Sequence, residues 1–216
     1  MTKNEKNTEI RSFGELAAPR LVRSADGTET RTIEGYAVVF NVRSQLLPDY
    51  NVYRMVQEII DPAAIDDNLM RSCDIKALLE HDRSRMLARS YNGAGTLTLT
   101  KDERGIKYTF EAPDTADGNY ALEMVRRGDL FGSSFAYTTD EAIDGSVTYT
   151  KEGDTLIRTV HKIDKLYDVS IVSDPAYLDT SVTARSLDKA LNIPEPNQEN
   201  DEWKVDVEAL NRAMNE

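Results

Sequence analysis

A chain of 216 residues is long enough for one well-packed domain with terminal extensions, and short for two full domains. Its formal net charge of −12 argues against nucleic-acid binding through a basic surface and against binding to an anionic membrane. The single cysteine, Cys73, cannot form an internal disulfide, and one cysteine with two histidines argues against a structural zinc site. No stretch approaches the roughly 20 apolar residues of a membrane helix, and the polar N-terminus lacks the apolar core of a signal peptide. We therefore expect a soluble intracellular protein.

The chain begins with polar residues, and residues 1–18 are predicted to form a flexible N-terminal tail. Beyond this tail, alternating or continuous apolar patterns predict a series of strands. The short polar segment 101–104 is typical of a hairpin turn between two of them. The expected strands cover residues 30–40, 55–60, 74–79, 95–100, 105–111, 130–138, 145–149, 155–163 and 166–172.

Two helices are expected between these strands. Asp61 as N-cap and Pro62 in the first turn predict a short helix over 62–70. Helical spacing of apolar residues predicts a second helix over 115–127, which Gly128 would end. The fold class expected from this order is mostly β with peripheral helices, built as a single closed or strongly curved antiparallel β-barrel over residues 19–186.

The last part of the chain has a different composition. Charge and proline increase after Arg185, and the segment 193–200 contains two prolines, which indicates a linker. Residues 201–215 then carry apolar side chains at helical spacing. We expect residues 187–216 to form a linker and a C-terminal amphipathic helix, which packs either on the barrel or on a partner.

One set of residues has the side-chain types of a catalytic serine site. His81 follows a short apolar run, Ser134 lies in the segment Gly132-Ser133-Ser134, and Asp168 lies on the last expected strand. A serine hydroxyl becomes a good nucleophile only when a nearby base takes its proton, and histidine titrates near neutral pH. The histidine needs a partner on its other ring nitrogen, which a carboxylate can supply. By residue type alone the more common alternative is a turn serine and a polar histidine at a strand end.

Four segments around these residues occur in the order of a known family. They are Gly35-Tyr36-Ala37-Val38-Val39-Phe40-Asn41, Lys76-Ala77-Leu78-Leu79-Glu80-His81-Asp82, Gly128-Asp129-Leu130-Phe131-Gly132-Ser133-Ser134-Phe135 and Leu166-Tyr167-Asp168-Val169-Ser170-Ile171-Val172-Ser173-Asp174-Pro175-Ala176-Tyr177. Together they resemble the phage prohead serine proteases, the capsid-maturation proteases of tailed phages that are distantly related to herpesvirus assemblin. The resemblance covers residues 33–185 and implies a herpesvirus-protease-like barrel.

The resemblance also implies roles for individual residues. His81 matches the general base, Ser134 the nucleophile, and Asp168 the acidic residue of the family's last strand. Ser133 and Ser134 would point to opposite faces of one strand, and the motif favours Ser134. The third member is left open, because assemblin relatives use a second histidine and His161 lies on the preceding strand.

The chain departs from the family at three positions. Ala88 and Ala136 stand where glycine is common, so a residue with positive φ could be lost at either one. Asp168 is one methylene shorter than the more usual glutamate, which puts its reach to His81 in doubt. Asp82 is expected to cap a loop, and the segment 173–176 is a candidate for the oxyanion site.

The resemblance implies a serine endopeptidase that needs no metal or organic cofactor. Its substrates would be the major capsid protein or a scaffold segment, and the protease itself, cut inside the immature prohead in the host cytoplasm. Formation of a homo-oligomer is left open. The alternative is a non-enzymatic scaffold or assembly module on the same fold. An esterase-like hydrolase has less support, because no Gly-x-Ser-x-Gly elbow is present.

Overall fold

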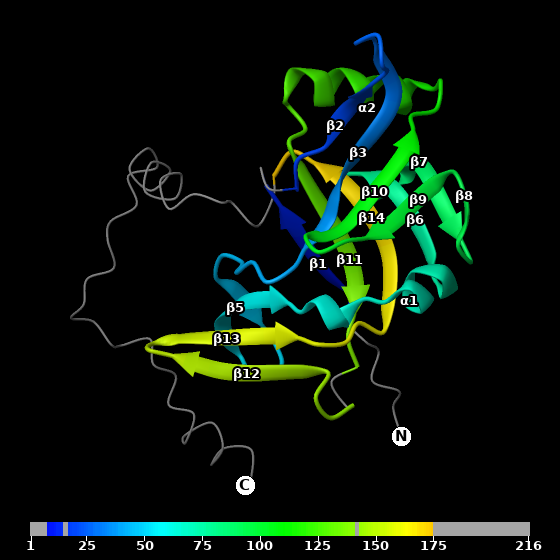
Figure 1. Cartoon of the computed structure of the whole chain (residues 1–216). Coiled ribbons are helices and arrows are strands. Elements are labelled where there is room, and N and C mark those ends of the chain that lie inside the picture. Colours follow the sequence, from blue (N-terminus) through cyan, green and yellow to red (C-terminus); the bar gives the residue numbers. More distant parts are fainter. Residues whose placement is uncertain (1–7, 15–16, 141–142, 175–216) are drawn as a thin grey trace, which may run out of the picture. The chain divides into compact units, whose positions relative to one another are not determined.

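The computed structural model describes residues 8–14, 17–140 and 143–174, which belong to the first of the two compact units of the chain. In these residues the strands form three separate open sheets (Figure 1). The strands are β1 (Glu9–Phe13), β2 (Arg20–Arg23), β3 (Glu29–Val39), β4 (Leu47–Asp49), β5 (Arg54–Ile60), β6 (Asp74–Leu79), β7 (Asp82–Tyr91), β8 (Ala94–Gly95), β9 (Leu97–Lys101), β10 (Gly105–Glu111), β11 (Gly132–Thr138), β12 (Val147–Glu152), β13 (Thr155–Val160) and β14 (Lys165–Val172).

The largest sheet has six strands in the order β1-β11-β14-β6-β7-β8. Its neighbouring strands are antiparallel, except that β14 and β6 run parallel. β11 is buried at every position, as expected for a strand that is covered on both faces. This sheet brings together the three segments that carry His81, Ser134 and Asp168.

The other two sheets have four strands each, in the orders β2-β3-β10-β9 and β12-β13-β5-β4. In the second of them β13 and β5 are parallel neighbours. The hydrophobic core takes side chains from all three sheets, including Phe135 of β11, Ile33 of β3 and Val160 of β13. Their burial joins the sheets into one packed unit.

The prediction of a single closed or strongly curved antiparallel barrel is wrong. Each of the three strand orders ends in two different edge strands, and two of the strand pairs are parallel. The alternation of apolar residues identifies where strands occur, but it carries no information on which strands pair or in which direction. The expectation of a mostly β fold with helices agrees with the structure.

The helices agree with the prediction in part. Helix α2 (Ala116–Arg127) begins at Thr115, whose side chain accepts a hydrogen bond from the Gly118 backbone, and it ends at Gly128 in a left-handed conformation. The segment 62–70 instead divides into a 3₁₀ helix, Pro62–Ala64, and helix α1 (Asp67–Ser72). Asp61 caps the first and Asp66 caps the second. Because this short segment contains two capping side chains, Asp61 and Asp66, it forms two short helices instead of one.

The N-terminal segment also differs from expectation. Residues 9–13 were assigned to a flexible tail, but they form the edge strand β1 paired with β11. Strand β7 was missed as well, because its sequence is rich in arginine and serine. The predicted linker and amphipathic helix over 187–216 lie outside the described residues. Within the described ranges, no helix is long and apolar enough to cross a bilayer.

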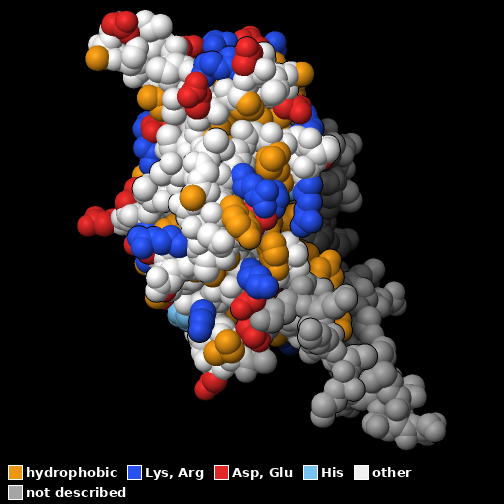
Figure 2. Space-filling view, turned by 90° about the vertical axis from the view of Figure 1, so that its right-hand side faces the viewer, with side chains coloured by type: hydrophobic (Ala, Val, Ile, Leu, Met, Phe, Trp, Pro, Cys, Tyr) orange, Lys and Arg blue, Asp and Glu red, His pale blue; other side chains and the backbone are white. Residues whose placement is uncertain are grey.

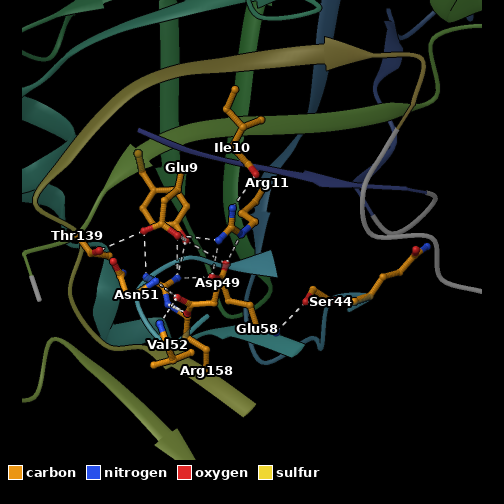
Figure 3. A network of polar contacts seen from close by, with 12 residues as sticks. Glu9, Ile10, Arg11, Ser44, Asp49, Asn51, Val52, Glu58, Thr139 and Arg158 are labelled. Atoms are coloured by element: carbon orange, nitrogen blue, oxygen red, sulfur yellow. Dashed lines mark hydrogen bonds and ion pairs between the residues drawn. The ribbon is translucent and has the colours of Figure 1, made fainter. Parts of the chain in front are cut away.

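A buried network of charges joins the six-stranded sheet to the sheet that contains β5 and β13 (Figure 3). Arg11 donates from Nε to Glu58 Oε1 at 2.7 Å and from Nη2 to Glu58 Oε2 at 2.9 Å. Arg158 also donates to Glu58 and, at 2.9 and 3.0 Å, to both carboxylate oxygens of Glu9. Glu58 and Arg158 are 0% and 1% exposed. Such charges are stable inside a protein only when every partner is present.

The pKa of Glu58 reports this pairing. Burial alone would raise the pKa of this carboxyl group, but the guanidinium groups of Arg11 and Arg158 outweigh burial and hold the pKa below its usual value. A carboxyl group of this kind stabilises the fold above its unfolded pKa of about 4.3, and this contribution is lost as pH falls through the lower folded pKa.

Glu58→Gln is expected to lower the free energy of unfolding at neutral pH by about 3 kcal/mol, because it leaves two buried guanidinium groups short of a charge partner. The loss should shrink as the pH falls from the unfolded pKa of about 4.3 through the lower folded pKa of Glu58, because the parent chain loses this contribution over that range. Urea denaturation at several pH values measures both effects. Glu152→Gln, which breaks an exposed pair with Arg43, is the control and should cost less than about 1 kcal/mol. Equal stability of Glu58→Gln and the parent would contradict the prediction.

Candidate active site

The serine candidate lies on β11, the second strand of the six-stranded sheet, next to the edge strand β1. Ser134 is on β11, opposite Ser12 of β1 on one side and Ser170 of β14 on the other. Successive side chains of a strand point to opposite faces, so Ser133 and Ser134 have different surroundings. Ser133 Oγ donates to the Ala17 carbonyl at 2.7 Å and lies 2.8 Å from the Tyr108 hydroxyl. Ser134 alone of the two faces His81.

The histidine candidate lies in a two-residue hairpin turn. Glu80 and His81 connect β6 to β7, and both have positive φ, 51° and 56°. Tight hairpin turns with positive φ at both central positions suit the twist of the strands, but they usually contain Asn or Gly. A left-handed conformation costs other residues roughly 1–2 kcal/mol each. A strained backbone at a residue that can take part in a reaction is typical of a functional site.

Contacts to β14 hold this turn in place. The Glu80 backbone amide donates to the Ile171 carbonyl at 3.0 Å, and the Ser173 amide donates to Glu80 Oε1 at 2.9 Å. Because the turn is tied to β14 through residue 80, the imidazole at residue 81 projects over the strand that carries Asp168 and Ser170.

The three candidate side chains form one line of contacts. His81 Nε2 lies 2.5 Å from Ser134 Oγ, and His81 Nδ1 lies 2.6 Å from Asp168 Oδ1. The His81 and Asp168 side chains are 17% and 9% exposed. A carboxylate on Nδ1 fixes the tautomer in which Nε2 can accept the serine proton. Asp168 therefore reaches the imidazole despite being one methylene shorter than glutamate.

Ser170 also belongs to this site, although the sequence analysis assigned it no role. Its hydroxyl donates to Asp168 Oδ1 at 2.8 Å and lies 3.2 Å from His81 Nδ1. It stands two residues after Asp168 on β14, on the same face of the strand. The alternation of the strand was the sequence signal that could have identified it.

The other candidate residues lie elsewhere. His161 contacts Asp61 Oδ2 through Nδ1 and Thr148 Oγ1 through Nε2, both at 2.9 Å, so both ring nitrogens are engaged away from Ser134. Asp82 accepts hydrogen bonds from the Ser84 amide and hydroxyl, as a loop cap does. Neither Ala88 nor Ala136 has positive φ, so alanine in place of glycine leaves the backbone unstrained at both positions. Of the segment 173–176, residues 175 and 176 lie outside the described part.

Two groups of β1 cover Ser134. Ser12 Oγ donates to Ser134 Oγ at 2.9 Å, and Ser134 Oγ donates to the Arg11 carbonyl, also at 2.9 Å. Ser134 is 0% exposed as a result. A pocket of about 460 Å³ is lined by Asp168 together with basic and acidic side chains such as Lys165 and Asp164, and neither Ser134 nor His81 lines it. The face of the molecule in Figure 2 carries Lys and Arg side chains interspersed with acidic and hydrophobic ones.

Comparisons with known proteins identify the family of the chain. The model of the caudovirus prohead serine protease family matches residues 20–193, a segment that includes His81, Ser134 and Asp168. Among solved structures, the bacteriophage T4 capsid assembly protease gp21 is similar with a TM-score of 0.47 and 13% identity, covering 80% of this chain and 100% of that one. No curated protein sequence matches the chain. Since the family model matches more than half of its length, the protein belongs to the caudovirus prohead serine protease family.

Proposed function

We propose that this protein is a serine endopeptidase that cleaves capsid or scaffold proteins, and itself, during prohead maturation. Ser134 is the nucleophile, His81 is the general base and then the general acid, and Asp168 orients the imidazole. The observation that carries the proposal is the continuous line of contacts from Asp168 Oδ1 through both nitrogens of His81 to Ser134 Oγ. Each contact is within hydrogen-bonding distance, as such a mechanism requires.

The chemical steps follow from these contacts. His81 Nε2 takes the proton of Ser134 while Oγ attacks the carbonyl carbon of the substrate. When the tetrahedral intermediate collapses, the carbon–nitrogen bond breaks and His81 gives its proton to the leaving amine. Water then attacks the acyl-enzyme, with His81 again taking a proton. His81 returns this proton to Ser134, and the new carboxyl end of the substrate is released.

Asp168 and Ser170 act on the imidazole. The carboxylate of Asp168 accepts a hydrogen bond from Nδ1–H and stabilises the imidazolium that forms during both attacks. Ser170 donates to the same carboxylate oxygen, which fixes the rotamer of Asp168. Because Ser170 touches no substrate atom, it is a positioning residue.

The substrate we propose is a segment of the major capsid protein or of a scaffold protein, reached inside the immature prohead in the host cytoplasm. Membership of the prohead protease family supports this class of substrate. One observation favours the alternative, a non-enzymatic assembly module: Ser134 is completely buried, and a buried hydroxyl cannot attack a substrate. The two functions differ in whether Ser134 ever becomes reactive.

Ser134→Ala is expected to reduce cleavage of the co-expressed capsid protein by a factor of about 10⁴ or more, because it removes the nucleophile. Gel analysis of the capsid protein and intact-mass analysis of both chains measure processing. His161→Ala is the matched control, because His161 contacts only groups outside the proposed site, and processing should continue. Undiminished cleavage by Ser134→Ala chains that retain the parent circular dichroism spectrum would refute the assignment.

Asp168→Asn and Ser170→Ala test the orientation of His81. Asp168→Asn should lower kcat by a factor of about 10⁴, because an amide favours the wrong imidazole tautomer. Ser170→Ala should lower kcat by about tenfold, leave KM nearly unchanged, and shift the pH–rate profile through the loss of one hydrogen bond to the carboxylate. Ser170→Thr keeps the hydroxyl and should restore most of the activity. A Ser170→Ala enzyme with parental kcat and pH profile would remove Ser170 from the mechanism.

A further inference from the structure

Burial of the proposed nucleophile needs an explanation. Ser134 is 0% exposed, whereas the side chain of its neighbour His81 is 17% exposed. An endopeptidase must bring the carbonyl carbon of an extended substrate to the serine oxygen. In the described state that oxygen already contacts the Ser12 hydroxyl, the Arg11 carbonyl and the imidazole of His81. Two of these three contacts come from β1.

Strand β1 pairs with the edge of β11 that β14 leaves open. It has five residues and pairs antiparallel with β11, with Ser12 opposite Ser134. The other edge of β11 is filled by β14, which carries Asp168. A peptide that adds to β11 as a strand therefore has one edge available, and β1 takes it. Addition of a strand to a sheet edge is a common way to bind extended peptides.

The backbone of β1 lies where the backbone of a substrate must come to reach Ser134. Ser134 Oγ donates to the carbonyl oxygen of Arg11, so a peptide carbonyl of the chain itself lies at the hydroxyl. We propose that β1 is an internal occupant of the substrate-binding edge of β11, and that an extended peptide strand binds there after β1 is displaced. This inference rests on the proposed protease function and names the binding mode of its substrate.

Charged side chains hold β1 in this position. Residues 9, 11 and 13 alternate with residues 10 and 12, so β1 presents Ser12 to the site and turns Glu9 and Arg11 toward the charge network (Figure 3). Arg11 pairs with Glu58 of β5, and Glu9 pairs with Arg158 of β13. The network thus binds the strand from the face opposite Ser134.

The extent of the family match fits this reading. The matched segment begins at residue 20, after β1, and includes the three proposed catalytic residues. β1 therefore lies outside the segment that identifies the family. It is also an edge strand whose Ile10 side chain is 48% exposed, and it is held by pairing with β11, by the charge network and by Phe13, which is buried against Phe135.

A reversible disulfide tests the displacement of β1. Ile10 and Ala136 are direct partners across β1 and β11, and cross-strand partners lie about 4.5–5.5 Å apart at Cα, within the range of a disulfide. In the Ile10→Cys/Ala136→Cys chain, a fluorophosphonate should label Ser134 at least tenfold more slowly in the oxidised form than after reduction. Capsid-protein cleavage should follow the same order. Each single cysteine variant, under the same oxidation, is the control for the added thiols.

A second variant should act in the opposite direction. Arg11→Ala keeps the backbone of β1 but removes its side-chain contacts to Glu58. Labelling of Ser134 should become about tenfold faster, because the loss of charge-assisted hydrogen bonds shifts the opening equilibrium of β1 by at least that factor. Arg20→Ala removes an exposed arginine of β2 that pairs with Glu34 of β3, both strands of another sheet, and should leave the rate unchanged.

The outcomes separate the two proposals. Equal labelling of the oxidised and reduced double-cysteine chain would overturn the displacement of β1 while leaving the protease function standing. Slower labelling of an Arg11→Ala chain that keeps the parental secondary structure would show that β1 contributes to the active site. This result would also overturn the displacement of β1. Labelling of Ser134 in none of the chains, reduced double-cysteine and Arg11→Ala included, would overturn the protease function and the inference together.

Discussion

The contact between His81 Nε2 and Ser134 Oγ is the interaction on which the proposed chemistry depends, and the order of the strands makes it possible. β14 lies between β11 and β6, so the serine strand and the strand that leads to the histidine turn are separated by two strand spacings, about 10 Å. The left-handed turn at residues 80 and 81 directs the imidazole back over β14. The strand that it crosses supplies Asp168 and Ser170.

The turn carries a backbone cost that this arrangement must offset. The cost of two residues with positive φ must be met by contacts elsewhere, and the ties from Glu80 to β14 supply some of them. The register of the parallel pairing between β14 and β6 fixes the position of the turn along β14 relative to Asp168. A slip of this register by one residue would turn Asp168 and Ser170 to the opposite face. Catalytic geometry here is therefore a property of the sheet.

The sequence predicted the local features and missed those that depend on distant contacts. Helix α2 was predicted because its cap, its apolar spacing and Gly128 lie within fourteen residues. His81, Ser134 and Asp168 were identified by residue type and family resemblance, and the structure brings them together. The sheet order was not predictable from alternation, so three open sheets were mistaken for a barrel. β1 was assigned to a tail because its polar residues pair with Glu58 and Arg158, which are distant in sequence.

The same strand pairing that builds the site also closes it. β11 has two edges, and one is permanently filled by the strand that carries the acid. A peptide substrate and β1 therefore compete for the remaining edge, and they compete with the same backbone hydrogen bonds. Side chains add to the hold of β1 on this edge, because Arg11 and Glu9 pair with Glu58 and Arg158, and Phe13 is buried against Phe135. Holding a substrate close to the protease raises the effective concentration of that substrate and favours it in this competition, and we propose that assembly inside a shell provides that proximity.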